Sequence, residues 1–258
     1  MAVPLHFERW GNGLPAYIFL HGFLGNLDNW RTIARSLALP GRYYLIDARN
    51  HGRSPHTATH RYPDMAEDLI YLLDQEALPS AHVLGHSMGG KTAMYAALHF
   101  PERIASLIVV DIAPRAYAGG HEALLAALAQ VNLQVQRREE IEAQLAHTIA
   151  DPGIRQFLLK NLARQADGTF YWRINLPVLI RTYPFVGEAI TGPAYKGPAL
   201  FLRGERSTYI RAEDEAVIRS LFPRAELRVI PNAGHWVHVD NPAAVLSEIQ
   251  RFWGALSK

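Results

Sequence analysis

A strand, a tight turn and a helix follow one another between His82 and His99, and this stretch restricts the fold more than any other. It begins His-Val-Leu-Gly-His-Ser-Met-Gly-Gly-Lys, so Ser87 lies at the centre of a Gly-x-Ser-x-Gly turn. Such a turn strains the serine backbone and requires small residues two positions to either side, a requirement that Gly85 and Gly89 meet. The helix that follows aims its free N–H groups at the serine, which favours negative charge there. We therefore interpret Ser87 as a nucleophile rather than as an inert serine in a glycine-rich turn.

Short apolar runs alternate with helical patterns along most of the chain, which is typical of a parallel sheet with crossover helices. The predicted strands are Ala16–Leu20, Tyr43–Asp47, His82–Gly85, Ser106–Asp111, Ala199–Gly204 and Glu226–Ile230. Leu5–Trp10 is expected to add an antiparallel edge strand. With 258 residues, 49% of them hydrophobic, the chain can bury one large core. We predict one main α/β domain with its chemistry at the carboxyl ends of the strands.

The alternation stops between Asp111 and Ala199. Helical patterns follow one another there, over Glu122–Val131, Glu139–Ala150 and Ile154–Arg164. We predict that residues 115–196 form a helical cap over the site, inserted into a core made of residues 1–114 and 197–258. Aromatic side chains of this segment could line the substrate pocket or pack within the cap itself. They are Phe170, Trp172, Tyr183 and Phe185.

The composition excludes several kinds of site and partner. The chain has no cysteine, which rules out disulfides, thiolate metal sites and a cysteine nucleophile. Its formal charge of +2 comes from scattered basic residues, so nucleic acid is not an expected partner. No apolar run has the length of a membrane span and no secretory signal is recognisable, so we expect a soluble, cytoplasmic protein. No cluster with metal-ligand spacing is evident, and neither a metal nor a cofactor is expected.

A serine nucleophile needs a base, and His235 is the predicted base. Chains with this turn carry their catalytic residues in the order serine, acid, histidine, so a histidine after the last strand is favoured. His235 lies in the run Pro-Asn-Ala-Gly-His-Trp, before a helix expected near Pro242. His86 is expected to shape the serine turn and, with Trp236, to contact the substrate. His238 is interpreted as a packing or substrate-side residue, because no third ligand for a metal pair is evident.

Acyl transfer also requires two backbone N–H groups that bind an oxyanion. Met88, directly after Ser87, is expected to supply one of them. The other is expected from the run His-Gly-Phe-Leu-Gly after Ala16–Leu20, where glycines let the backbone turn its N–H groups inward. Phe23 is the predicted donor, with Leu24 behind it on the substrate side. A glycine loop alone would indicate no function, but the serine turn and the late histidine give it one.

Together these motifs resemble those of the α/β-hydrolases along the whole chain. The narrower similarity is to the small bacterial esterases of the YbfF type and their mitochondrial relatives. It is carried by Asp-Ala-Arg-Asn-His-Gly at 47–52, Tyr-Trp-Arg-Ile-Asn-Leu at 171–176 and Asn-Ala-Gly-His-Trp-Val-His at 232–238. The resemblance implies an α/β-hydrolase fold with esterase or thioesterase activity on short to medium acyl groups, and no cofactor.

The resemblance also requires a choice of the acid that orients the histidine. Many α/β-hydrolases carry an aspartate shortly after the glycine of the penultimate strand, where this chain has Ser207. Asp111 closes a predicted strand, and the resembling esterases place their acid there. We predict Asp111, with Glu205 as the rival and a turn-capping role as the alternative for Asp111. Asp47 also ends a strand, but its neighbours suggest a structural turn.

Two classes of function remain open at this stage. An enzyme that cleaves a small-molecule ester or thioester is favoured by Ser87, Met88 and His235 together. The other class is a binding or sensing protein that keeps the fold without turnover. Dehalogenases and epoxide hydrolases of this fold attack with a carboxylate, so the serine argues against both. A perhydrolase or a carbon–carbon hydrolase stays open because the same residues serve it, and the oligomeric state is not indicated.

Overall fold

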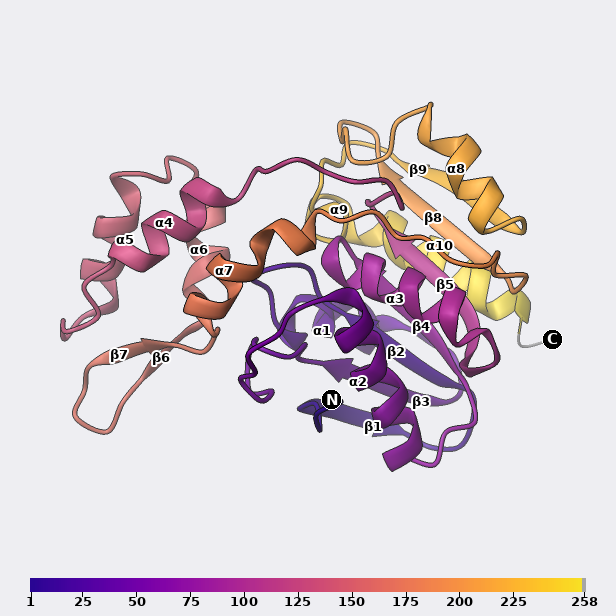
Figure 1. Cartoon of the computed structure of the whole chain (residues 1–258), viewed down its shortest axis with the longest axis horizontal. Helices are drawn as coiled ribbons and strands as arrows, with labels where there is room; N and C mark the ends of the chain where they lie inside the picture. The colour runs from indigo at the N-terminus through magenta and orange to yellow at the C-terminus, as the bar shows by residue number, and fades with distance from the viewer. Residues whose placement is uncertain (257–258) are drawn as a thin grey trace.

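The core of the protein is a seven-stranded sheet in the order β1-β3-β2-β4-β5-β8-β9 (Figure 1). The structure is a computed structural model and describes residues 1–256. In this sheet β1 pairs antiparallel with β3, and every other neighbouring pair is parallel. The strands are β1 Phe7–Gly11, β2 Ala16–Leu20, β3 Arg42–Ile46, β4 Ala81–His86, β5 Ile104–Val110, β8 Ala199–Gly204 and β9 Ala225–Ile230.

Each predicted strand is present, including the antiparallel edge strand, so the predicted α/β architecture is confirmed. The apolar runs form parallel strands because helices cover both faces of the sheet. Along β2, Ile18 packs into one core and Phe19 into the other, and every residue of the strand is buried. The centre of the sheet is therefore closed to solvent on both faces, and polar side chains can meet there only at the ends of the strands.

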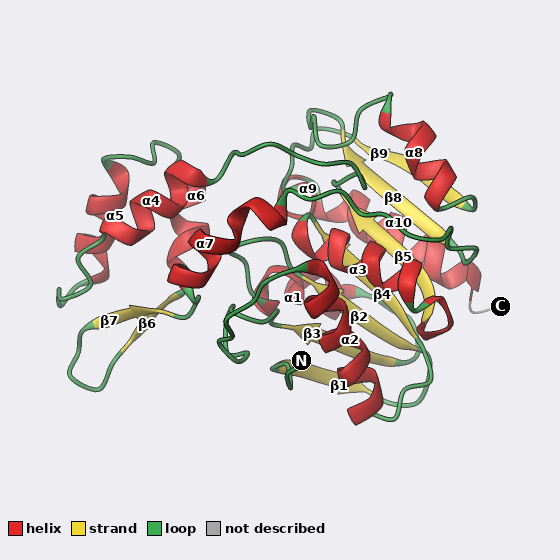
Figure 2. Ribbon diagram, in the orientation of Figure 1, coloured by secondary structure: helices red, strands yellow, loops and turns green. Residues whose placement is uncertain are grey.

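Helices on opposite faces of the sheet carry these two cores (Figure 2). Leu69 of α2, Ala93 of α3 and Ile218 of α8 belong to one core. Ile33 of α1 and Ile249 of α10 belong to the other. The bounds are α1 Arg31–Ser36, α2 Tyr62–Gln75, α3 Met88–His99, α8 Asp214–Leu221, α9 Val237–Asp240 and α10 Pro242–Leu256, with 3-10 turns at Leu27–Trp30 and Pro101–Arg103. Within the described residues, no helix has the length and apolar character that a membrane span requires.

The segment between β5 and β8 forms a separate group of elements beside the sheet, which we call the cap (Figure 1). It contains α4 Glu122–Gln130, α5 Arg138–Ala146, α6 Pro152–Leu159, β6 Leu162–Arg164, β7 Phe170–Trp172 and α7 Leu176–Val186. The predicted insertion is therefore present. The predicted helix Ile154–Arg164 is wrong in its last part, because Leu162–Arg164 pairs antiparallel with β7 in a small hairpin.

Candidate active site

Ser87 lies in the sharp turn between β4 and α3. Its φ of 51° and ψ of −116° are strained for a residue with a side chain. A Cβ on Gly85 would lie 2.1 Å from the carbonyl oxygen of Gly89, and a Cβ on Gly89 would lie 2.5 Å from that of His21. The backbone can therefore make this turn only with glycine at both positions, as predicted.

Asp111 and His235 lie side by side at the edge of the sheet. Asp111 follows β5, is completely buried and has a φ of 52°. The His235 Nδ1 lies 2.8 Å from the Asp111 Oδ2. The other carboxylate oxygen accepts the Gly204 N–H at 2.9 Å, and the Ser207 hydroxyl donates to Oδ2. With Oδ2 accepting from Nδ1–H, the histidine keeps Nε2 unprotonated and able to take a proton.

Glu205, the rival acid, makes a different contact. Its side chain is exposed, and its Oε2 accepts the backbone N–H of Asn232 at 2.8 Å. The structure thus brings Asp111, and not Glu205, to His235.

The loop after β2 presents backbone N–H groups next to Ser87. Within residues 1–256, the N–H groups of Phe23 and Met88 have no hydrogen-bond partner. Leu24 has a φ of 59°, a conformation that a leucine rarely adopts. Its N–H donates to His51 Nε2 at 3.1 Å, and its carbonyl accepts Asn161 Nδ2 of the cap at 2.7 Å. Both peptide groups of Leu24 are thus held, and the adjacent Phe23 is fixed with them.

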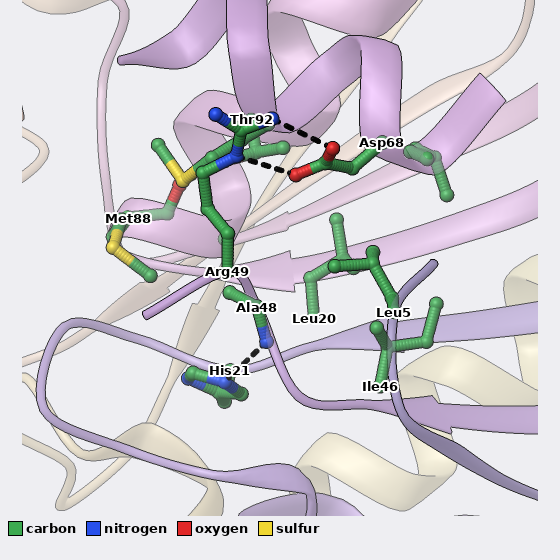
Figure 3. Close-up of a pocket in the computed structure, with 12 residues that line it drawn as sticks. Leu5, Leu20, His21, Ile46, Ala48, Arg49, Asp68, Met88 and Thr92 are labelled. Carbon is green, nitrogen blue, oxygen red and sulfur yellow. Dashed lines mark hydrogen bonds and ion pairs between the residues drawn. The ribbon is translucent and has the colours of Figure 1, made fainter. Parts of the chain in front are cut away.

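The Asp-Ala-Arg-Asn-His-Gly run at 47–52 packs against the loop after β2 and holds it in place. The buried Arg49 makes two hydrogen bonds, of 2.6 and 2.7 Å, to the Asp68 carboxylate of α2 (Figure 3). In the same view, the His21 imidazole accepts the N–H of Ala48 at 3.0 Å. Asp47 accepts the N–H groups of Leu27 and Arg53, each within 3 Å, and has the structural turn role expected for it.

The same run also ties the cap to the core. The N–H of Asn175, at the start of α7, donates to the Asn50 carbonyl at 2.9 Å. The two side chains meet as well, with Asn175 Nδ2 lying 3.0 Å from Asn50 Oδ1. Together with the Asn161 bond to Leu24, these contacts place the cap directly over the loop after β2. The sequence alone does not indicate that His51 and Asn161 bind Leu24, because both are distant from it in sequence.

Ser87 lies where two cavities meet. The larger one has a volume of about 690 Å³ and reaches from Ser87 and His235 to Phe157 and Trp236. The smaller one has a volume of about 280 Å³ and is lined mostly by aromatic and apolar side chains of core and cap. Phe23, Ser87, His121 and Tyr209 line both. An ester held at Ser87 can therefore extend its two arms into separate spaces.

Some of the residues predicted to contact the substrate line the cavities at Ser87, and others do not. Leu24, His86 and Trp236 line the larger cavity, and Tyr183 lines the smaller one. Trp172 lines neither. Its indole N–H donates to the Leu128 carbonyl at 3.3 Å, and its ring belongs to the hydrophobic core. The substrate-contact prediction for Trp172 is therefore corrected, since β7 turns this side chain into the packing of the cap.

The other two aromatic candidates from the cap also pack elsewhere. Phe170 belongs to the same hydrophobic core as Trp172, with the Arg164 guanidinium 5.0 Å from its ring. The Phe185 ring lies under the guanidinium of Arg61, at 4.1 Å. Neither ring lines the two cavities at Ser87.

The histidines around His235 are held neutral by burial. His86 donates from Nε2 to the His235 carbonyl at 2.9 Å, which fixes the loop that carries His235. Burial, with the neighbouring His235 and His238 adding to it, holds the pKa of His86 well below its usual range. His238 packs between Trp30 and His86, and burial lowers its pKa to about 3. No three His, Asp or Glu side chains of residues 1–256 are grouped to hold a metal ion.

Lys91 is a buried amine that the sequence patterns did not single out. Its Nζ donates to the carbonyls of Arg115 at 3.0 Å and of Gly187 at 3.4 Å, and also to that of Glu188. These carbonyls belong to the segments that lead into and out of the cap. Burial, with the nearby Arg115 adding to it, lowers the pKa of Lys91 to about 7.

Residues 15–242 match the family described as alpha/beta hydrolase fold, and the chain belongs to this family. A solved structure, that of a marine microorganism esterase, superimposes with a TM-score of 0.95 at 40% identity and covers 97% of this chain and 100% of its own. The predicted fold and family are therefore confirmed.

Two curated relatives indicate the kind of hydrolase. The chain is 41% identical over 254 residues to the sn-1-specific diacylglycerol lipase ABHD11 of Mus musculus, covering 93% of this chain and 81% of that protein. It is 38% identical over 237 residues to the esterase YbfF of Escherichia coli, covering 91% of each chain. The chain is thus an esterase/lipase-type hydrolase, as the sequence predicts.

Proposed function

We propose that this protein is a serine hydrolase that cleaves carboxylic esters through an acyl-enzyme on Ser87. The observation that carries the proposal is the 2.8 Å contact between His235 Nδ1 and Asp111 Oδ2, in a cavity that Ser87 also lines. The strained φ of Ser87 supports it, because an inert serine would not need this conformation. Phe23 and Met88 supply the oxyanion hole with their free N–H groups.

In the first half-reaction, Nε2 of His235 takes the hydroxyl proton of Ser87 while Oγ attacks the ester carbonyl carbon. The carbonyl oxygen becomes an oxyanion that the N–H groups of Phe23 and Met88 bind. The carbon–oxygen bond to the leaving group then breaks, and the imidazolium returns its proton to the departing alkoxide. In the second half-reaction, water repeats these steps and releases the acid. Asp111 stays ionised and stabilises the imidazolium.

The substrate we propose is a neutral ester with a short to medium acyl group. The smaller cavity at Ser87 is lined mostly by aromatic and apolar side chains, which favours an uncharged acyl group there. The relatives support this class, since one carries the name of a diacylglycerol lipase and another that of an esterase. An acyl thioester offers the same carbonyl to Ser87, so we include thioesters among the proposed substrates.

The test is a panel of p-nitrophenyl esters of rising chain length, with acyl thioesters alongside. Wild-type protein should hydrolyse acyl groups of short to medium length, and Ser87→Ala and His235→Ala should each lose at least about a thousandfold in kcat. A fluorophosphonate probe should label only Ser87, because a formed oxyanion hole and an activated serine are both needed. A folded wild type that neither turns over nor labels would refute the proposal in favour of a binding protein.

A further inference from the structure

The loop after β8 contacts both the acid and the base of the proposed triad. The Ser207 hydroxyl donates to Asp111 Oδ2, and it accepts the N–H of Tyr209 at 3.2 Å. The Tyr209 ring lies face to face with the imidazole of His235, with ring centroids 3.7 Å apart and an interplanar angle of 17°. This loop is where many α/β-hydrolases carry their acid. In this chain the loop instead carries Ser207, which contacts the proposed acid, and Tyr209, which contacts the proposed base.

The orientation of the Tyr209 ring is fixed from several directions. Its N–H is bound to Ser207, and its carbonyl accepts the hydroxyl of Tyr117. The Tyr117 ring stacks against that of Tyr209 at 5.5 Å and 27°. Burial raises the pKa of Tyr209, with the carboxylate of Asp111 adding to the effect, so the phenol stays neutral. The ring therefore presents a constant, electron-rich face to His235.

We infer that Tyr209 is a positioning residue that stabilises the protonated form of His235 through the face of its ring. The inference rests on the proposed function. An aromatic face attracts a cation far more than it attracts a neutral imidazole. In the proposed mechanism His235 becomes an imidazolium when it takes the Ser87 proton. The contact with Tyr209 is therefore stronger in the transition state than in the free enzyme, and this difference accelerates the reaction.

The other groups that face His235 leave this role to Tyr209. Asp111 is the negative partner at Nδ1. His86 lies 4.7 Å from the His235 ring, and burial holds its pKa well below the usual range. Burial likewise lowers the pKa of His121 and His238, with His235 a further cause in each case. None of these imidazoles offers a stacked, electron-rich face of the kind that Tyr209 presents.

The experiment replaces Tyr209 by leucine, by phenylalanine and by a series of mono-, di- and trifluorophenylalanines. Tyr209→Phe should keep kcat within roughly twofold, because the ring face remains. Tyr209→Leu should lose about five- to thirtyfold in kcat. Fluorine withdraws electron density from the ring with little change in shape, so kcat should fall steadily along the series toward the value of the leucine variant. A role in packing alone predicts the same kcat for the whole series.

Tyr95 provides a matched control outside the site. It stacks on His99 within α3, with ring centroids 4.0 Å apart and an angle of 23°. The same fluorinated series at Tyr95 should leave kcat unchanged. Tyr209 lines both cavities, so substrate contact is the competing explanation. It predicts a change in KM with kcat retained, and that result would overturn the inference.

Failure of this inference can be told apart from failure of the proposed function. If the Ser87→Ala and His235→Ala variants lose the activity of the wild type while kcat is constant across the Tyr209 series, then only the role of Tyr209 is refuted. If wild-type turnover survives in Ser87→Ala, the proposed function fails and the Tyr209 inference fails with it. Circular dichroism and thermal melts of each variant confirm that the folded fraction is the same.

Discussion

Replacing Asp111 by asparagine tests the geometry at the edge of the sheet. The two carboxylate oxygens accept from three donors, namely the Gly204 N–H, the Ser207 hydroxyl and His235 Nδ1. An amide has a single acceptor oxygen, so in either orientation its NH₂ group faces at least one of these donors. At a completely buried position this conflict should lower the free energy of unfolding by about 1–3 kcal/mol.

The effect of Asp111→Asn on catalysis should be larger than its effect on stability. If the amide NH₂ group faces His235, the imidazole is held in the wrong tautomer. If it faces Gly204 instead, the side chain is displaced, and in both cases the imidazolium loses its negative partner. In the general account of the Ser-His-Asp triad, the same swap in another hydrolase lowers turnover about ten-thousandfold. We expect kcat on p-nitrophenyl butyrate to fall by at least roughly a hundredfold here.

Glu205→Gln is the matched control, because among residues 1–256 its carboxylate accepts a single backbone N–H, that of Asn232. A glutamine oxygen can accept the same bond, so kcat should change by no more than about threefold. Both variants are assayed on one ester, with circular dichroism to show that they are folded. If kcat falls strongly in Glu205→Gln and is unchanged in Asp111→Asn, the acid has been assigned wrongly.

Four further predictions concern the serine turn, the larger cavity, the packing of the cap and the buried Lys91. Gly85→Ala should destabilise the fold by about 3 kcal/mol or more in urea titrations, since its Cβ would lie 2.1 Å from a backbone oxygen; stability equal to wild type would contradict the turn geometry. Phe157→Ala should extend the range of accepted acyl chains, as measured on p-nitrophenyl esters, because this ring lines the larger cavity. Trp172→Ala should instead cost about 3–5 kcal/mol of stability and leave chain-length preference unchanged. Because burial lowers the pKa of Lys91 from 10.5 to about 7, the unfolded chain binds more protons than the folded one between these values, and stability should rise with pH across that interval. Lys91→Met should remove this rise, and an unchanged slope in urea titrations would show that another group causes it.

Local sequence was sufficient to predict the sharp turn at Ser87 and the sheet. The contact that excludes a Cβ at Gly85 is made by Gly89, which is close in sequence, so the two glycines make the turn at Ser87 recognisable in the local sequence. The strands could be predicted because β2 and its parallel neighbours are buried on both faces and therefore consist almost entirely of apolar residues. The choice of Asp111 depended on the family resemblance, since two strand ends approach the same edge of the sheet.

The cap was harder to predict because its elements are short and their patterns ambiguous. Ile154–Arg164 has helical spacing throughout, yet α6 ends at Leu159 and the chain turns into β6. The Asp-Gly pair at 167–168 is a hairpin signal that would have located β6 and β7. α7 carries Pro184 in its interior, which propensity alone reads as a break.

Contacts between residues that are distant in sequence could not be predicted from the sequence alone. Ser207 stands out in the sequence only because it occupies the position where many α/β-hydrolases carry their acid, and nothing singles out Tyr209. Their contacts with Asp111 and His235 exist only once β5, β8 and β9 are side by side. His51 is part of a recognisable run, but nothing local shows that it binds the N–H of Leu24.

The position of Lys91 has a consequence for how the molecule can be rebuilt. One ammonium group binds carbonyls from the segment that enters the cap and from the segment that leaves it. The chain therefore enters and leaves the cap at nearly the same point, which is the geometry that tolerates exchange of a whole inserted segment. The cap can in principle be replaced by another of different shape, joined at the same two ends, while Ser87, Asp111 and His235 remain on the sheet that holds them.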